Sequence, residues 1–223
     1  MGAAAVARES LMPGSPPSSL LDHALREQVR ANLAAFHRQA VANAALQAAA
    51  VAIVLVPDEA GRAAFLLTRR APRLRSHGGQ WALPGGRLDK AESQEAAALR
   101  ELQEELGLAL EPTSVLGLLD DYPTRSGFVI TPVVVWGEGV GEPQPNPREV
   151  AAVHRIAVAE LARADVPCFR SIPESDRPVI SIPLLGTQIH APTAALLYQF
   201  VEVAFRGRDT RVAHFEQPVF AWR

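Results

Sequence analysis

Three carboxylates lie within five residues of one another, at Glu101, Glu104 and Glu105. On a helix, residues three and four apart are surface neighbours, and like charges at that spacing repel by a few tenths of a kcal/mol per pair. A rotation of about 100° per residue confines the three side chains to an arc of about 100°. Such a cluster is typical of a cation site, and hard divalent cations such as Mg²⁺ prefer oxygen ligands.

The same stretch predicts the helix that must position the cluster. On the helical wheel an apolar face adjoins the carboxylates, so that face is expected to pack against a core. Asp89 and Glu92 have the spacing of a capping box, and Gly107 suits the position that ends a helix. We therefore expect a helix over residues 91–106. Its apolar face consists of Leu99, Leu102 and Leu106.

A longer pattern surrounds the cluster. Gly86 is followed after five residues by Glu92, and after seven more by the run from Arg100 to Leu108. An ordinary solvated acidic helix face would explain the glutamates, but it would not explain this spacing. The pattern resembles the Nudix box, so the chain resembles the Nudix hydrolases. That resemblance implies an α+β fold in which a mixed β-sheet core is sandwiched between helices and the box forms a loop-helix-loop.

The resemblance also implies roles for the box residues. Nudix hydrolases use Mg²⁺ or Mn²⁺ to cleave a nucleoside diphosphate linked to another group. Glu101 and Glu105 are the implied metal ligands, and Glu104 is a third ligand or the general base. The backbone carbonyl of Gly86 is expected to join the metal shell. Glu104, Arg100 and Glu101 are the residues predicted to act in catalysis.

Two points about these roles stay open. Arg100 can pair with Glu104 one helical turn later or with Glu92 across the loop, and either pairing would hold the cluster in place. The general base must reach the attacking water, and a carboxylate outside the helix could serve. The candidates for that base are Asp120, Asp121 and Glu149.

The residues before the box bear on the substrate. Residues 66–86 resemble the extra motif of coenzyme A pyrophosphatases, with matches that include Leu66, Leu67 and Thr68. The basic residues of this segment suit phosphate oxygens, although a solvated basic loop and, for the histidine, a structural hydrogen bond are the alternatives. The predicted substrate-binding residues are Arg69, Arg70, Arg75, His77 and Gly85.

Three functions are therefore considered. The leading one is metal-dependent hydrolysis of coenzyme A or acyl-coenzyme A to phosphopantetheine and adenosine 3′,5′-bisphosphate. The second is a Nudix hydrolase acting on ADP-ribose, a dinucleotide polyphosphate or an oxidised nucleoside triphosphate. The third belongs to another class, a Nudix-like domain that senses a nucleotide without catalysis. Such domains usually lose box glutamates, and this chain keeps them.

The rest of the chain is consistent with one domain. Its 223 residues are 48% hydrophobic, which is enough for one sizeable core. We expect a flexible tail over residues 1–17 and a single domain over 18–223, with an N-terminal helix capped by Ser18 or Ser19 and a C-terminal extension. Further helices are expected over 18–38, 157–164 and 193–205. Strands are expected over 48–56, 64–69, 115–119, 128–136, 150–156 and 179–185, with a short one near 80–82.

Charge and cysteine usage limit the partners. The net charge of −2 gives no electrostatic reason to expect a nucleic-acid polymer or an anionic membrane as partner. No apolar stretch reaches the roughly 20 residues that span a bilayer. The single cysteine, Cys168, fits a reducing cytoplasm. We expect a cytoplasmic protein that binds a small molecule, with a homodimer as an inference from the fold alone.

Overall fold

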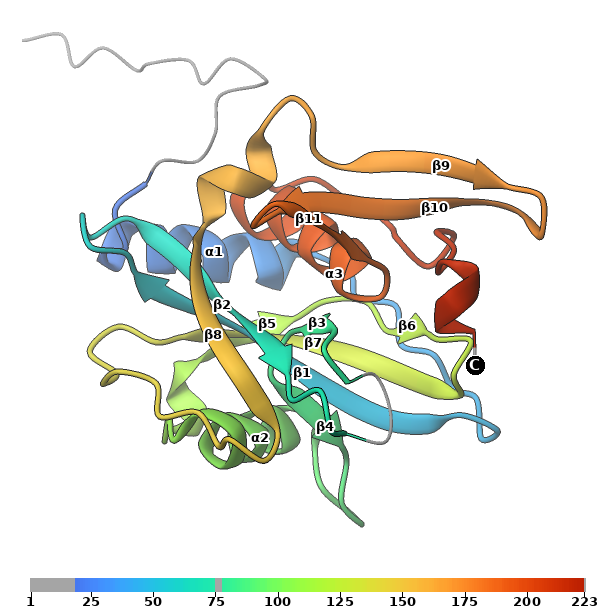
Figure 1. Cartoon of the computed structure of the whole chain (residues 1–223). Helices are drawn as coiled ribbons and strands as arrows, with labels where there is room; N and C mark the ends of the chain where they lie inside the picture. The colour runs from blue at the N-terminus through green and yellow to red at the C-terminus, as the bar shows by residue number, and fades with distance from the viewer. Residues whose placement is uncertain (1–18, 75–77, 223) are drawn as a thin grey trace, which may run out of the picture.

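The computed structural model describes residues 19–74 and 78–222 (Figure 1). The predicted tail over residues 1–17 lies outside the described residues, as do Arg75 and His77. Within the described residues, one mixed sheet contains eight strands and a second sheet contains three. The strands of the large sheet are β1 (Gln47–Pro57), β2 (Ala63–Arg70), β3 (Trp81–Ala82), β4 (Gly85–Arg87), β5 (Val115–Leu118), β6 (Tyr122–Pro123), β7 (Phe128–Trp136) and β8 (Val150–Ala157).

In the large sheet, an opening between β1 and β2 shapes the site. Strands β1 and β7 run parallel at its centre, while β2 pairs antiparallel with β8. Strand β1 pairs with β2 only over residues 55–57, and its other half pairs with β4 at residues 49–51. Strand β3 pairs with the end of β2. Strands β1 and β2 therefore diverge, and the segment 81–87 fills the opening between them.

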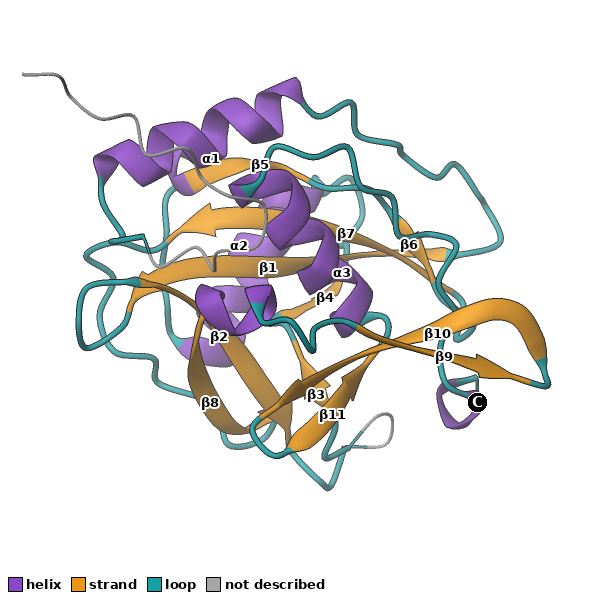
Figure 2. Ribbon diagram, turned by 90° about the horizontal axis from the view of Figure 1, so that it is seen from above, coloured by secondary structure: helices purple, strands orange, loops and turns teal. Residues whose placement is uncertain are grey.

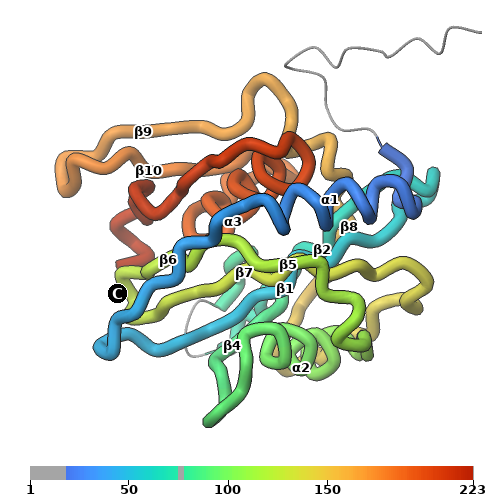
Figure 3. Tube along the Cα trace, turned by 180° about the vertical axis from the view of Figure 1, so that it is seen from behind, coloured from blue at the N-terminus to red at the C-terminus, as the bar shows by residue number. Residues whose placement is uncertain are grey.

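Helices cover both faces of the large sheet. Helix α2 (Gln94–Leu106) lies below the sheet in Figure 1, and α1 (His23–Ala35) and α3 (Thr193–Phe200) lie above it. Figure 2 shows α1 alongside β5, and Figure 3 shows α2 beside β4. The chain continues from α3 into one turn of π-helix, η3 (Val201–Phe205), which contacts α1. None of the described helices is long and apolar enough to cross a membrane.

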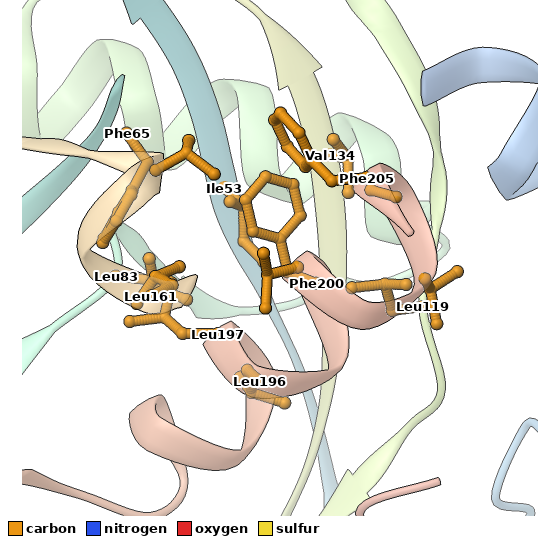
Figure 4. Close-up of a cluster of buried hydrophobic side chains, with 14 of the residues drawn as sticks. Ile53, Phe65, Leu83, Leu119, Val134, Leu161, Leu196, Leu197, Phe200 and Phe205 are labelled. Carbon is orange, nitrogen blue, oxygen red and sulfur yellow. The ribbon is translucent and has the colours of Figure 1, made fainter. Parts of the chain in front are cut away.

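Two hydrophobic clusters follow from the alternation of side chains along each strand. On β1, Ile53 points into a cluster with α1 and α3, whereas Val54 points into a cluster with α2. Figure 4 shows the first cluster, in which Ile53 and Phe65 from the sheet meet Leu197 and Phe200 from α3. The sheet is thus buried on both faces, which explains why β1 and β2 read as nearly continuous apolar runs.

The smaller sheet and the C-terminal segment lie on the α3 side. Its order is β11 (Thr187–His190), β10 (Ser175–Leu184) and β9 (Cys168–Ile172), all antiparallel. The β9–β10 hairpin projects beyond the large sheet in Figures 1 and 2. The C-terminal segment returns to this hairpin, where Glu216 N donates a 2.9 Å hydrogen bond to the Pro178 carbonyl. Short turns of 3₁₀-helix are η1 (Pro112–Ser114), η2 (Val158–Ala162) and η4 (Val219–Ala221).

The α+β architecture predicted from the sequence is confirmed, but several boundaries are wrong. Helix α1 begins at His23, with Asp22 as N-cap in place of Ser18 or Ser19. The reason is that the preceding residues are extended, since Ser19 accepts a backbone hydrogen bond from Ala63. Strands β4, β6, β9 and β11 were not predicted. The predicted helix over 157–164 is a 3₁₀ turn, and the one over 193–205 changes to π-helix at residue 201.

Candidate active site

Helix α2 carries the carboxylate cluster and is fixed at both ends. It begins after Ser93, whose hydroxyl accepts a 3.2 Å hydrogen bond from the backbone of Ala96, so the predicted start at residue 91 is three residues too early. It ends at Gly107, which has the left-handed φ of 68° that glycine adopts freely. Leu102 and Leu106 are fully buried against the sheet. These contacts fix the rotation of the helix and therefore the direction of its carboxylates.

Arg100 joins several parts of the box. Its Nε donates to Glu92 Oε1 at 2.9 Å, and its Nη1 donates to Glu101 Oε1 at 2.8 Å and to Glu104 Oε2 at 3.2 Å. Its Nη2 donates to the Arg87 carbonyl at 2.9 Å. Both pairings left open by the sequence, with Glu92 and with Glu104, are therefore present. The hydrogen bond from Arg100 lowers the pKa of Glu92, so this pair stays ionised.

The three glutamates of the cluster occupy different environments. The side chain of Glu104 is 56% exposed, whereas those of Glu101 and Glu105 are 13% and 5% exposed. Glu105 Oε2 accepts a 3.3 Å hydrogen bond from the Gly85 backbone. Burial raises the pKa of Glu105 to about 7, and the charge of Arg70 opposes that rise. Burial likewise raises the pKa of Glu101 against the effect of its arginine neighbour.

Gly85 and Gly86 lie against other backbone and side-chain atoms with no room for a Cβ. A Cβ on Gly86 would lie 2.2 Å from Glu101 Oε1, and a Cβ on Gly85 would lie 2.3 Å from the Ala50 carbonyl oxygen. The pairing of β4 with β1, in which Gly86 lies opposite Ala50, produces the close contact between Gly85 and the Ala50 carbonyl oxygen. Residue size at position 86 therefore determines how closely the Glu101 carboxylate approaches β4, and residue size at position 85 determines how closely β4 approaches β1.

Only one of the three outlying carboxylates lies near the cluster. The charge of Glu149 contributes to raising the pKa values of both Glu101 and Glu105. Asp120 and Asp121 instead form buried ion pairs elsewhere, at 2.8 Å from Arg211 Nη1 and 2.6 Å from Arg38 Nη2 respectively. These two aspartates are engaged in holding the chain near β5 and β6 to other segments. Glu149 is therefore the candidate base outside the helix that the geometry favours.

The predicted phosphate-binding arginines separate onto two faces of the sheet. Arg70 Nη1 lies 3.9 Å from Glu105 Oε1, on the α2 side. Arg69 lies on the α3 side, where its guanidinium is 5.9 Å from the centre of the Trp81 ring. The alternation of side chains along β2 requires this separation. Of the predicted substrate-binding residues that the structure describes, Arg70 and Gly85 thus reach the cluster and Arg69 does not.

One further residue at the site, Asn146, was not predicted to act there. Its backbone N donates a 2.8 Å hydrogen bond to the Glu105 carbonyl, and its Nδ2 lies 3.4 Å from Glu149 Oε1. Asn146 therefore links the end of α2 to the outlying carboxylate. The Asn146-Pro147 pair, which breaks regular structure before β8, is the signal by which the sequence could have pointed to this link.

The carboxylates of the site bear on whether a divalent metal fits there. In the part of the chain that the structure describes, no three His, Cys, Asp or Glu side chains are gathered in the arrangement of a metal site. Arg100 donates hydrogen bonds to the carboxylates of Glu101 and Glu104. Among the described residues, however, the buried Glu105 carboxylate accepts one long hydrogen bond and has no ion pair shorter than 3.9 Å. A buried charge is costly unless it is compensated, and a cation beside Glu101 and Glu105 would supply that compensation.

Comparison with known proteins gives matches in sequence and in fold. A family model described as "NUDIX domain" matches residues 46–172, more than half of the chain. Two bacterial relatives are named "Uncharacterized Nudix hydrolase NudL". The one from Citrobacter koseri is 41% identical over 118 residues, which cover 50% of this chain and 59% of the relative. The one from Cronobacter sakazakii is 42% identical over 122 residues, covering 52% and 60%.

The matched region spans about three fifths of the length of these relatives. A solved structure of a MutT/nudix family protein from Enterococcus faecalis has a TM-score of 0.53 and 17% sequence identity to this chain. The superposition covers 74% of this chain and 64% of that protein. At this identity the likeness shows that the two proteins share a fold.

Proposed function

This chain belongs to the Nudix hydrolases, enzymes that act on pyrophosphate bonds, and from that premise we propose that it cleaves the diphosphate of a nucleoside diphosphate derivative with Mg²⁺ or Mn²⁺. One observation carries the proposal. Glu105 is buried beside Glu101 and the glycines of β4, and the residues that the structure describes supply too few donors to balance its charge. Divalent metals are typical of the family, and these two carboxylates suit a hard cation.

The proposed roles follow from the contacts. Glu101, Glu105 and the backbone of Gly86 would hold the metal, which when bound supplies charge stabilisation and an acidified water. Arg100 orients Glu101 through its 2.8 Å hydrogen bond. Glu104 or Glu149 would take the proton from the attacking water. The Glu104 side chain is 56% exposed, and Asn146 donates a 3.4 Å hydrogen bond to only Oε1 of Glu149, so each carboxylate is a candidate for that role.

Coenzyme A or an acyl derivative is the proposed substrate. Support comes from the resemblance of residues 66–86 to the coenzyme A pyrophosphatase motif. The structure gives several motif residues positions that shape the site: Thr68 Oγ1 donates a 2.9 Å hydrogen bond to the Ala82 carbonyl, which holds β3 beside β2. Arg70, from the same motif, faces the cluster and suits a diphosphate oxygen.

A product-identification screen tests the proposal. The protein is incubated with Mg²⁺ or Mn²⁺ and coenzyme A, ADP-ribose, diadenosine polyphosphates or nucleoside triphosphates, and products are separated by chromatography. We expect phosphopantetheine and adenosine 3′,5′-bisphosphate from coenzyme A. Cleavage of ADP-ribose or a dinucleotide polyphosphate instead would change the proposed substrate but would support the proposed type of reaction. Absence of turnover of every diphosphate would reject the enzymatic reading in favour of a nucleotide sensor.

Matched variants test the residues. Glu101→Gln and Glu105→Gln should each lower kcat at least about a hundredfold, because each removes a charged metal ligand at nearly constant volume. Glu111→Gln, an exposed position that makes no capping hydrogen bond, is the control and should keep wild-type activity. Mn²⁺ binding measured by electron paramagnetic resonance should weaken in the first two variants only. Unchanged Mn²⁺ binding in both would contradict the metal assignment.

The remaining proposals concern context. We propose a homodimer that acts in the cytoplasm on a free small molecule and binds no nucleic-acid polymer. The near-neutral net charge and the single cysteine support this setting. Light scattering of the purified chain tests the dimer, and cell fractionation tests the location.

A further inference from the structure

A cavity of about 390 Å³ lies between the β6–β7 turn, β10 and the C-terminal segment, near the end of the chain marked in Figure 1. None of its lining residues belongs to α2 or β4, so it is separate from the carboxylate cluster. Its volume is at the lower end of the range for ligand pockets, about 300–1,000 Å³. The polar part of its lining consists of Tyr122, Thr124, Arg125, Arg177, Glu216 and Gln217.

The one acidic residue of this lining is already neutralised. Glu216 is only 2% exposed. Its Oε1 accepts from Arg125 Nε at 3.2 Å and from Gln217 N at 2.9 Å, and its Oε2 accepts from Arg125 Nη2 at 2.6 Å and from Ser175 Oγ at 3.0 Å. The Glu216 charge is therefore balanced by Arg125. Each of its carboxylate oxygens already accepts two hydrogen bonds, so Glu216 offers no free lone pair to a ligand in the cavity.

Arg177 adds a positive charge that nothing in the described part of the chain balances by an ion pair. Its strand, β10, has a register shift against β9 between Ser175 and Val179. Irregularities of this kind re-aim side chains and are frequent near functional sites. Burial raises the pKa of Tyr122, and the charges of Arg177 and Arg125 oppose that rise. Both guanidinium groups thus act on the same wall of the cavity.

Arg125 is rigid but not saturated. Its backbone N donates a 2.7 Å hydrogen bond to Gln217 Oε1, and its guanidinium lies 5.0 Å from the centre of the Trp222 ring. Glu216 uses Nε and Nη2. Among the described residues, Nη1 of Arg125 donates to no protein acceptor, and the side chain is 49% exposed. A fixed guanidinium with one free edge loses little entropy when it binds an oxyanion.

We propose that this cavity is a binding site for a phosphate group, held by the free edge of Arg125 and by Arg177. Arginine forks match the geometry of phosphate oxygens and give charge-assisted hydrogen bonds. The polar, open lining suits a hydrated oxyanion better than an apolar ligand. The phosphate belongs either to a separate small anion or to a second phosphate group of the nucleotide substrate. The site does not depend on the proposed hydrolysis, since it contains no residue of the box.

Inorganic phosphate is the first probe, in metal-free buffer without other oxyanions. Binding is followed by tryptophan fluorescence, because Trp222 contacts Arg125, and by thermal unfolding, because a ligand of the folded state raises Tm. We expect saturable binding with a Kd of about 1 mM. Arg177→Ala should weaken it about tenfold or more, the effect of losing roughly one charge-assisted hydrogen bond.

Two control variants make the result specific. Arg30→Ala removes an equally exposed arginine from α1 and should leave phosphate affinity unchanged. Arg70→Ala removes the arginine beside Glu105, so it identifies any phosphate bound at the box instead. Equal affinity of Arg177→Ala and Arg30→Ala, a loss seen in Arg70→Ala instead of Arg177→Ala, or no saturable binding would each overturn the proposal.

Adenosine 3′,5′-bisphosphate and AMP then distinguish the two sources of phosphate. If Arg177→Ala weakens the bisphosphate at least about tenfold and leaves AMP unchanged, the cavity holds the second phosphate of a nucleotide. If Arg177→Ala weakens binding of inorganic phosphate but leaves the affinity for both nucleotides unchanged, the cavity binds a separate anion. Either result keeps the site, and both are measured by binding without turnover, so they stand apart from the test of hydrolysis.

Discussion

The two adjacent glycines of β4 provide a sharp test of the site, because the same substitution meets different obstacles at each. In Gly86→Ala the new Cβ would lie 2.2 Å from Glu101 Oε1, the far end of a flexible side chain. In Gly85→Ala it would lie 2.3 Å from the Ala50 carbonyl oxygen and 2.6 Å from Val51 Cα, which are backbone atoms of the central strand. The first obstacle can move, and the second cannot without distorting β1.

The magnitudes follow from these distances. To restore an ordinary contact of 3.4 Å, Glu101 Oε1 must retreat by roughly 1 Å, and a misplacement of that size can cost about a hundredfold in rate. The folded state should lose no more than about 1 kcal/mol, because the Arg100–Glu101 pair that shifts is partly exposed. Gly85→Ala should instead destabilise by about 3 kcal/mol or more, lowering Tm by roughly 6 to 12 °C for a chain of this size.

The assay combines turnover with thermal unfolding. Steady-state kinetics on the substrate identified by the screen, with Mg²⁺, should show the hundredfold loss in kcat for Gly86→Ala while circular dichroism shows a near-native Tm. Mn²⁺ binding should weaken in parallel. If Gly86→Ala folds and keeps wild-type turnover, the contact between Glu101 and the β4 backbone has no part in catalysis. If Gly85→Ala melts at the same temperature as Gly86→Ala, the steric reasoning about β1 is wrong.

Three further predictions concern other positions. Glu149→Gln should lower kcat at least tenfold with little change in KM, as expected for a general base, whereas Glu142→Gln, an exposed acid of the preceding loop, should have no effect on steady-state kinetics. Glu216→Gln should cost about 1 kcal/mol at pH 7 in urea unfolding. Hydrogen bonds from its arginine partner lower the pKa of Glu216 below the ordinary 4.5. The contribution of Glu216 to the free energy of unfolding is therefore complete above about pH 4.5 and is lost as the pH falls through the folded-state pKa. The variant should lack that acid-dependent loss of stability. Leu102→Ala should destabilise by about 2 to 5 kcal/mol in the same measurement because the side chain is fully buried, and Leu20→Ala, at an exposed position, should stay within about 0.5 kcal/mol.

Helix α2 and its carboxylates were accessible to sequence reasoning because the relevant signals are local. Apolar spacing predicted the buried face with Leu102 and Leu106, and Gly107 predicted the end of the helix. The different burial of Glu104 and Glu105 was not accessible. It depends on the pairing of Gly86 with Ala50, a contact between distant parts of the chain that no local pattern contains.

The sequence-based prediction that Arg69 and Arg70 both bind phosphate was limited in another way. The sequence places them side by side, but a strand sends neighbouring side chains to opposite faces. Had the strand over 64–69 been extended by one residue to its observed end, alternation alone would have separated them. Strand β9 gave no comparable signal, since most of Cys168–Ile172 is exposed and lacks an alternating apolar pattern.

The position of the carboxylates depends as much on small residues as on the glutamates themselves. Four fully buried alanines fill both sides of the contact between α2 and β1: Ala50 and Ala52 on the strand, and Ala97 and Ala98 on the helix. The helix can therefore lie close to the sheet. At that separation the Glu105 side chain reaches the backbone N of Gly85, and the Glu101 side chain reaches Gly86, where the missing Cβ leaves space for it. Gly86 and Glu101 are therefore two halves of one steric arrangement: a larger residue at position 86 would move the Glu101 carboxylate away from the backbone that completes the site.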